Sequence, residues 1–327
     1  MKKLIISLFL IPFFCYSQNT IHYPDDVLPT DSALLFAPGL INTGLFTRDF
    51  TMSPDRQEIY FSILSGRNAF IMVSNYKNEK WNEPEIASFS GSNQFFDFEP
   101  HISADGNKIY FLTTRPTEGQ EIKPGWQNQN IFVVDRTKDG WSEPYDIGSP
   151  VNTIYNEFYP SVSENNNFYF THSTDTKDAA LYVSEYQNGK YCEPQKLSFG
   201  NDSMLMLYNA TVSRDESFIL TCGSPKDNPG KSNYYVSFNL GNHNWSDLID
   251  ITNYIGYEGG AAASISLSPD GKYIFFSAIV ADEKNTAVYA GMTLSEIKEN
   301  RIKPQIGSSN VYWISSKFIR ELQKMKL

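Results

Sequence analysis

A pattern of turn and strand residues that recurs five times constrains this 327-residue chain more than any other feature. Each copy has a short strand that ends in serine, a turn of the Ser-Pro-Asp-Gly type, and an apolar strand such as Ile59–Phe61. Proline presets φ and Gly or Asn tolerates positive φ, so each copy predicts a β-hairpin. The aligned serines are Ser53, Ser103, Ser163, Ser213 and Ser268, which are 50, 60, 50 and 55 residues apart.

A second marker follows the third apolar segment of the repeats. Trp81-Asn-Glu-Pro84 recurs as Trp141-Ser-Glu-Pro144, and weaker copies begin at Tyr191 and Trp245. Each marker leads into a fourth short strand, where proline is tolerated because an outer strand can leave one edge unpaired. We expect Trp81 and Trp141 to be buried between strands or blades, and the turn aspartates to cap their own turns. Four strands in about 50 residues are typical of a propeller blade.

The stretch Ser268-Pro-Asp-Gly-Lys-Tyr-Ile-Phe-Phe276 is the most specific copy. It resembles the TolB-type, WD40-like propeller repeat of exported bacterial proteins, and the resemblance covers about residues 40–320. The resemblance implies an all-β fold, a single β-propeller of four-stranded blades. The repeats predict five blades, with six as the alternative.

The fifth repeat lacks the Trp-x-Glu-Pro marker, so its fourth strand must come from elsewhere. An open sheet edge is a liability, and Ala33–Pro38 resembles the strand that precedes the first repeat in this family. We therefore expect Ala33–Pro38 to close the ring. Asn310–Ile314 is predicted to be the third strand of the last blade, and Ser316–Lys326 a short amphipathic C-terminal helix.

The N-terminus has the pattern of a secretory signal peptide. A basic head, Met1-Lys2-Lys3, precedes the apolar run Leu4–Phe14, which is too short to span a bilayer. The bulky Phe13 and Phe14 before Cys15 disfavour a lipid anchor. We expect residues 1–18 to be a signal peptide, 19–32 an N-terminal extension and 33–327 the propeller domain. This predicts a periplasmic or extracellular protein without a transmembrane segment.

Charge and motifs exclude several classes of function. The formal net charge of −10 disfavours nonspecific binding to nucleic acid, which needs a basic surface. No nucleophile-elbow, Walker or dinucleotide motif is present, and we expect no cofactor. Cys192 and Cys222 remain after the signal is removed, and either a disulfide or two buried thiols fits an exported chain.

Candidate ligand-binding residues gather on one face of the expected ring. In a propeller, the loops that enter the inner strands lie on the same face as the loops between second and third strands; we call this the channel-mouth face. The candidates near it are Arg48, Asp49, Asp97, Glu99, His101, Arg115, Glu157, Tyr208, Asn209 and Glu258. The carboxylates either join blades by pairing with Arg67 and Arg115, or they bind a cation, a basic ligand or a sugar.

Two insertions, residues 113–129 and 280–309, lengthen loops on the channel-mouth face, where long loops often carry function. The resulting hypothesis is an exported binding or scaffolding propeller whose partner is a protein or a glycan. The alternative is a carbohydrate-active or metal-dependent hydrolase or lyase that uses carboxylates at the central channel. No residue is assigned a catalytic role. The alternation of side chains along its strand could aim His101 at the channel, but no second histidine lies at the spacing of metal ligands on one element. The sequence therefore leaves open whether the site binds a metal ion.

Overall fold

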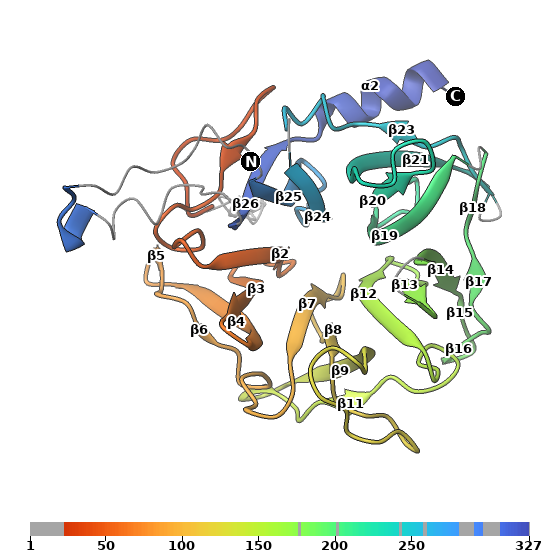
Figure 1. Cartoon of the computed structure of the whole chain (residues 1–327), viewed down its shortest axis with the longest axis horizontal. Helices are drawn as coiled ribbons and strands as arrows, with labels where there is room; N and C mark the ends of the chain where they lie inside the picture. Colours follow the sequence, from red (N-terminus) through yellow and green to blue (C-terminus); the bar gives the residue numbers. More distant parts are fainter. Residues whose placement is uncertain are drawn as a thin grey trace, which may run out of the picture.

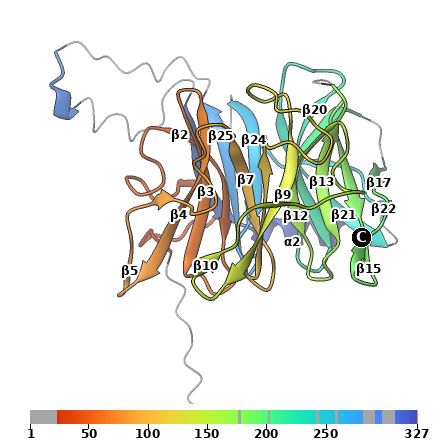
Figure 2. The ribbon, with the colours of Figure 1, turned by 90° about the horizontal axis from the view of Figure 1, so that it is seen from below.

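The computed structural model describes residues 23–175, 178–200, 203–241, 244–257, 260–280, 291–296 and 308–326. The chain is all-β, with 49% strand and 4% helix, and its antiparallel sheets form the five blades of a β-propeller. Figure 1 shows the ring down its axis and Figure 2 shows it from the side. The five-bladed prediction is confirmed and the six-bladed alternative is wrong. The expected signal peptide, residues 1–18, lies outside the described residues.

Blades 1 and 2 follow the predicted repeat closely. In each, the marker divides the outer strand into two short pieces, and both pieces pair with the third strand. Blade 1 contains β2 (Phe46–Met52), β3 (Glu58–Ser65), β4 (Asn68–Lys77), β5 (Lys80–Trp81) and β6 (Glu85–Ile86). Blade 2 contains β7 (Asp97–Ile102), β8 (Lys108–Thr113), β9 (Asn130–Thr137), β10 (Gly140–Trp141) and β11 (Tyr145–Asp146).

Blades 3 and 4 are formed by the more divergent repeats, and the chain that links them pairs with the outer edge of blade 4. Strand β18 (Ser198–Phe199) pairs in parallel with β22 (Asn244–Trp245) of blade 4. Blade 3 contains β12 (Asn156–Val162), β13 (Phe168–Ser173), β14 (Ala180–Ser184) and β17 (Gln195–Lys196), beside the small pair β15 (Tyr186–Gln187) and β16 (Lys190–Tyr191). Blade 4 also contains β19 (Met204–Val212), β20 (Phe218–Pro225), β21 (Asn233–Gly241) and β23 (Ile249–Asp250).

Blade 5 is completed by the start of the described chain, as predicted. It contains β24 (Gly260–Leu267), β25 (Tyr273–Val280), β26 (Ser309–Ser315) and β1 (Leu34–Leu35). Leu34 lies opposite Trp313 in the antiparallel β1–β26 pair. The buried side chain of Asn42 extends this pairing, because its amide donates to the Val311 carbonyl at 2.9 Å and its oxygen accepts from the Val311 N–H at 2.9 Å. The two ends of the ring are therefore joined by side-chain as well as backbone hydrogen bonds.

The hydrophobic core lies between neighbouring blades. At the closure, Phe36 is fully buried and packs edge-on against Phe50 of blade 1 and Phe275 of blade 5. The helix α2 (Lys317–Lys326) covers blades 4 and 5 with Ile319 and Leu322. No helix in the described part of the chain is long and apolar enough to cross a membrane.

The repeat markers have the structural roles that the sequence predicts, with one correction. Asp55 accepts a hydrogen bond from Ser53 Oγ at 2.6 Å in its own turn, and Asp105 and Asp270 do the same in theirs. Trp141 donates to Tyr60 Oη of blade 1 at 2.9 Å and so joins two blades. However, Trp81 and Trp141 are only half-buried, whereas Trp245 from the weakest copy is 2% exposed. Cys192 and Cys222 are both free thiols.

Candidate functional site

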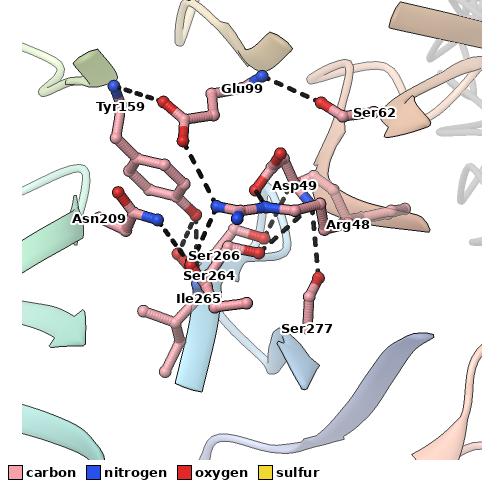
Figure 3. A network of polar contacts seen from close by, with 12 residues as sticks. Arg48, Asp49, Ser62, Glu99, Tyr159, Asn209, Ser264, Ile265, Ser266 and Ser277 are labelled. Atoms are coloured by element: carbon pink, nitrogen blue, oxygen red, sulfur yellow. Dashed lines mark hydrogen bonds and ion pairs between the residues drawn. The ribbon is translucent and has the colours of Figure 1, made fainter. Parts of the chain in front are cut away.

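Each inner strand carries a β-bulge at the same repeat position, and this positions the candidate residues. The pairing register shifts in β2, β7, β12, β19 and β24. In four of them a non-glycine residue adopts positive φ: Asp49 (60°), Glu99 (55°), Tyr159 (52°) and Asn209 (53°). A bulge re-aims a side chain that regular alternation would place elsewhere. The four side chains consequently face the central axis (Figure 3).

Hydroxyl groups of the preceding blade hold three of these four bulges in place. The backbone N–H of Asp49 donates to Ser277 Oγ at 3.3 Å, and that of Glu99 donates to Ser62 Oγ at 2.9 Å. The N–H of Asn209 donates to Thr171 Oγ1 at 3.0 Å. Left-handed backbone at non-glycine residues costs about 1–3 kcal/mol unless its surroundings enforce it. The repeated inter-blade hydrogen bonds supply that enforcement.

Arg48 crosses the axis and joins three blades (Figure 3). Its Nε donates to Asp49 Oδ1 at 2.7 Å, and its Nη2 lies 3.3 Å from Glu99 Oε1 of blade 2. The same Nη2 donates to the Ala263 carbonyl of blade 5 at 3.0 Å. Tyr159 of blade 3 extends the network, because its N–H donates to Glu99 Oε2 at 2.8 Å. The network thus fills the ring with polar contacts between blades.

Burial controls the protonation of this network. It raises the pKa of Asp49, while Arg48 opposes the shift. Burial and the charge of Asp49 together raise the pKa of Glu99 to about 8. Although burial disfavours the guanidinium, Asp49 and Glu99 raise the pKa of Arg48, which stays charged. One cation faces two buried carboxyl groups, so we infer that the pair of acids holds one proton at neutral pH.

The remaining acidic candidates are partnered inside their own blades. Asp97, whose side chain is fully buried, forms an ion pair with Arg115 and accepts from Thr113 Oγ1 at 2.8 Å. Burial raises the pKa of Asp97, and Arg115 opposes the shift. The predicted pairing with Arg115 is present but lies within blade 2 rather than between blades. Arg67 is exposed and forms no ion pair within the described residues, so its predicted pairing is wrong.

Glu157 also makes its hydrogen bonds to residues of its own blade. Its carboxylate lies 2.8 Å from His172 Nδ1 and accepts from Thr153 Oγ1 at 2.6 Å and from the Thr153 N–H at 3.0 Å. The register explains the first contact, because Glu157 and His172 are directly opposite each other in β12 and β13. Sequence reasoning did not connect these two residues. The strand pairing of aligned repeats is the signal that identifies them.

His101 joins two blades and also lines the cavity at one end of the axis. Its Nε2 accepts the backbone N–H of Val162 in blade 3 at 3.0 Å. Thr51 and Ser161 occupy the same repeat position and accept the corresponding N–H groups of the next blades. Burial lowers the pKa of His101 to about 4, and the Arg214 charge adds to the effect. Within the described residues, no group of three or more His, Cys, Asp or Glu side chains could hold a metal ion.

The other candidates complete the inter-blade contacts. Asn209 donates to the Ala263 carbonyl at 2.5 Å, and Tyr208 hydrogen-bonds Ser232 and the Ala262 carbonyl. Glu258 lies outside the described residues, as do residues 281–290 and 297–307 of the second insertion. Tyr159 was missed by sequence reasoning, although it occupies the same repeat position as Asp49. The structure therefore unites six candidates at the axis or beside it and places Asp97, Arg115 and Glu157 in separate clusters.

Comparison with known proteins places the chain by fold only. No family model matches it, and no curated protein matches it significantly. TolB from Acinetobacter baumannii resembles it with a TM-score of 0.47 and 14% identity, over 83% of this chain and 54% of that one. This chain thus spans about half the length of that TolB. The repeat pattern predicted such a resemblance, and TolB propellers are indeed among the similar structures.

Two fungal enzymes give somewhat higher structural similarity. The catalytic domain of the Coprinopsis cinerea GH62 α-L-arabinofuranosidase has a TM-score of 0.52 and 10% identity, over 89% of this chain and 97% of that one. An α-L-arabinofuranosidase from Podospora anserina has a TM-score of 0.50 and 12% identity, over 88% and 98%. At such low identity the likeness concerns the fold. The chain is accordingly a five-bladed β-propeller whose axis is closed by an inter-blade polar network.

Proposed function

We propose that this chain is an exported binding module that engages a protein partner through its channel-mouth face. The observation that carries the proposal is a set of exposed apolar side chains on two adjoining loops of that face, which we call the loop patch. Its members and exposed fractions are Ile122 (58%), Trp126 (38%), Ile154 (81%) and Tyr155 (46%). Exposed apolar clusters of this kind mark interaction sites.

Internal contacts hold the loop patch in shape. Gln120 of the first insertion donates to the Thr153 carbonyl at 3.1 Å and so joins the two loops. Asn130 donates to Gln120 Oε1 at 2.8 Å from the start of β9. The Trp126 ring packs against Phe96 at 4.9 Å between ring centroids. A surface ordered before binding loses less conformational entropy when a partner docks.

The composition of the loop patch favours a protein over other ligands. Trp and Tyr are enriched at protein interface hot spots, and an aliphatic side chain such as Ile154 has no group that could hydrogen-bond a sugar hydroxyl. The net charge of −10 disfavours nucleic acid. The signal-like residues 1–18 support export to the periplasm or the cell exterior.

Crosslinking in an envelope extract from the source cells tests the proposal. The wild-type chain, a Trp126→Ala/Ile154→Asp variant and a Leu240→Asp control are compared by mass spectrometry. Leu240 is 56% exposed at the end of β21, on the opposite face of the ring. We expect a protein that crosslinks to the wild type and the control but is lost with the loop-patch variant. Crosslinks that are identical for all three chains refute the proposal.

Glycan binding is a second candidate, and one specific observation favours it. A cleft of about 590 Å³ between the outer strands of blades 2 and 3 is lined by Tyr110, Tyr145, Tyr186 and Tyr191. Tyr145 and Tyr186 are 41% and 40% exposed. Tyr145 Oη donates to Asp135 at 2.9 Å beside Lys108, which provides a polar rim. Aromatic walls with hydrogen-bonding groups suit the apolar faces and hydroxyls of a sugar.

Affinity electrophoresis in gels that contain arabinoxylan or cellulose-derived polymers tests this candidate. Tyr145→Ala/Tyr186→Ala should remove any retardation of the wild-type chain. Tyr254→Ala is the matched control, because Tyr254 is 46% exposed and stacks on Phe318 away from the cleft. Retardation that survives in the double variant excludes the cleft as the sugar site. The likeness to arabinofuranosidases does not favour hydrolysis here, since the described carboxylates at the axis and channel mouth have internal partners.

A further inference from the structure

A cavity of about 680 Å³ lies at the end of the axis opposite to the channel-mouth face. We call this cavity the lower vestibule. All five inner strands reach it with their final residues, which are Thr51, Met52, His101, Ile102, Val162, Thr211, Val212 and Leu267. The hairpin turns of blades 4 and 5 and one side of α2 form its outer walls. It is separate from the loop patch and independent of the function proposed above.

The inner surface of the lower vestibule is mostly apolar. Met52, Ile102 and Val212 are buried side chains on three different blades. Ile319 of α2 closes one wall, and its packing against blades 4 and 5 holds the helix in place. Pockets of roughly 300–1,000 Å³ with apolar walls and a few polar groups are typical of small-molecule sites. The recess therefore suits a small ligand with an apolar body.

Three cations stand at the rim of the lower vestibule. Arg214 comes from the blade 4 turn, and Arg320 and Lys324 lie one turn apart on α2. All three are exposed, and within the described residues none forms an ion pair. The charge of Arg214 acts inside the lower vestibule, because it contributes to the lowered pKa of His101 on the opposite wall.

The two carboxylates of the lining are already engaged. Asp215 accepts from Ser213 Oγ at 2.8 Å and from the Ser217 N–H at 3.1 Å. Asp270 accepts from Ser268 Oγ at 2.7 Å and lies 3.3 Å from Arg56. Arg56 and Lys272 compensate the charge of Asp270, so the three rim cations face one uncompensated carboxylate, Asp215, and the lining is net positive on a chain whose net charge is −10. A cleft whose net charge is positive concentrates anionic ligands.

We propose that the lower vestibule binds a small organic anion with an apolar body, such as a medium-chain carboxylate. The apolar body lies against Met52, Ile102 and Val212, and the carboxylate meets Arg214, Arg320 and Lys324 at the rim. A polyanion such as nucleic acid has no apolar part to fill the recess. A folded protein surface cannot enter a cavity of this size.

Calorimetric titration of the mature chain with decanoate and with decyltrimethylammonium, both below their micellar concentrations, tests the proposal. The two probes share an apolar tail and differ in the sign of charge. We expect decanoate to bind at one site and decyltrimethylammonium to bind far more weakly. Decanoate affinity should fall as salt concentration rises. Equal binding of the two probes, or no binding of decanoate, overturns the proposal.

Charge variants locate the site. Arg320→Gln/Lys324→Gln should weaken decanoate binding roughly tenfold or more, because charged hydrogen bonds are lost. Arg67→Gln/Lys80→Gln makes the same change of charge at exposed positions of blade 1 and should leave the affinity unchanged. If both double variants weaken binding equally, the effect comes from net charge and the assigned site is wrong.

A filling variant tests the cavity without changing charge. Ala104 lines the lower vestibule at the turn position that Pro54 and Pro269 occupy in other repeats, so this position accepts larger side chains. Ala104→Phe should abolish decanoate binding while the melting temperature stays near the wild-type value. Full decanoate affinity in a folded Ala104→Phe chain contradicts the proposal. Trp126→Ala, which alters only the loop patch, should bind decanoate normally.

Discussion

Arg48 of blade 1 reaches across the axis to Glu99 of blade 2, with 3.3 Å between Nη2 and Oε1. The same guanidinium holds Asp49 at 2.7 Å and the Ala263 carbonyl of blade 5 at 3.0 Å. One side chain therefore connects the first, second and last blades, where the ring closes. Because two carboxyl groups share this single cation in a buried site, the closure of the ring is linked to pH.

The first prediction concerns Glu99. Its pKa is about 8 in the folded chain and 4.5 in its ordinary state, so the folded chain binds more protons between these values. The contribution of Glu99 to the free energy of unfolding is therefore fully present below pH 4.5. It is lost as pH rises through 8, by at most about 1.4 kcal/mol per pH unit. Between pH 6.5 and 8.5, Glu99→Gln should make the melting temperature nearly independent of pH.

The matched control is Glu118→Gln, at an exposed position of the first insertion. It should keep the wild-type decline in melting temperature above pH 6.5. A wild-type chain whose stability is flat or rises over this interval contradicts the protonation that we assign to the Asp49–Glu99 pair.

The second prediction concerns His101. The pKa of His101 is lowered to about 4 from 6.5, so its stabilising effect is present above pH 6.5 and is lost as pH falls through 4. Protonation of Nε2 also removes the acceptor for the Val162 N–H. His101→Thr, the residue type at the equivalent position 51, should retain an acceptor and reduce the loss of stability between pH 6.5 and 4.5. Urea titrations at both pH values measure this, and an unchanged acid sensitivity would exclude His101 as its cause.

The third prediction concerns ring closure. Asn42→Ala leaves the buried N–H and carbonyl of Val311 without their side-chain partners, so we expect a loss of about 2–3 kcal/mol in the free energy of unfolding. Thr43→Ala, at the exposed neighbouring position, should have almost no effect. Equilibrium urea unfolding of both variants gives the comparison. Equal stability of the two variants would show that β1 alone closes the ring.

The fourth prediction concerns the marker aromatics. Trp245 is 2% exposed, and Trp245→Ala should cost roughly 3–5 kcal/mol, as for a fully buried large aromatic. Trp81 is half-buried, so Trp81→Ala should cost less, roughly 1–2 kcal/mol. This order reverses what the strength of the sequence marker suggests. Unfolding free energies that follow marker strength instead would contradict the packing described here.

The repeats could predict most of the fold because each one contains its own turn chemistry and strand pattern. The Ser-Pro-Asp-Gly turns and the period of about 50 residues locate the hairpins, and a missing marker in the last repeat points to β1 as the closing strand. The burial of Trp245 and the half-burial of Trp81 depend on how neighbouring blades tilt together. That tilt is a tertiary property and leaves no local trace in the sequence.

The candidate site was harder to predict. The orientation of the axial side chains depends on β-bulges. The residue types of Asp49 and Tyr159 do not by themselves predict a left-handed backbone. The alternation of a regular strand predicts that His101 faces the axis, and it does line the cavity at one end of the axis. Alternation does not reveal that its Nε2 also accepts a hydrogen bond from the next blade. The lower vestibule requires α2 and five strand ends to meet, so its cations gather from positions 214 to 324 only in the folded ring.

The last prediction separates a binding propeller from a glycosidase. Glycoside hydrolysis requires two carboxyl groups about 5–5.5 Å or 6.5–9.5 Å apart, open to the substrate. Here Asp97 is engaged by Arg115, and Glu157 by His172 and Thr153, while both side chains are fully buried. We therefore expect no product from a panel of nitrophenyl glycosides or from arabinoxylan. Asp97→Asn should lower stability by about 3 kcal/mol, because Arg115 loses its charged partner. Turnover by the wild type that disappears in Asp97→Asn or Glu157→Gln, with melting temperatures unchanged, would show that these carboxylates are catalytic.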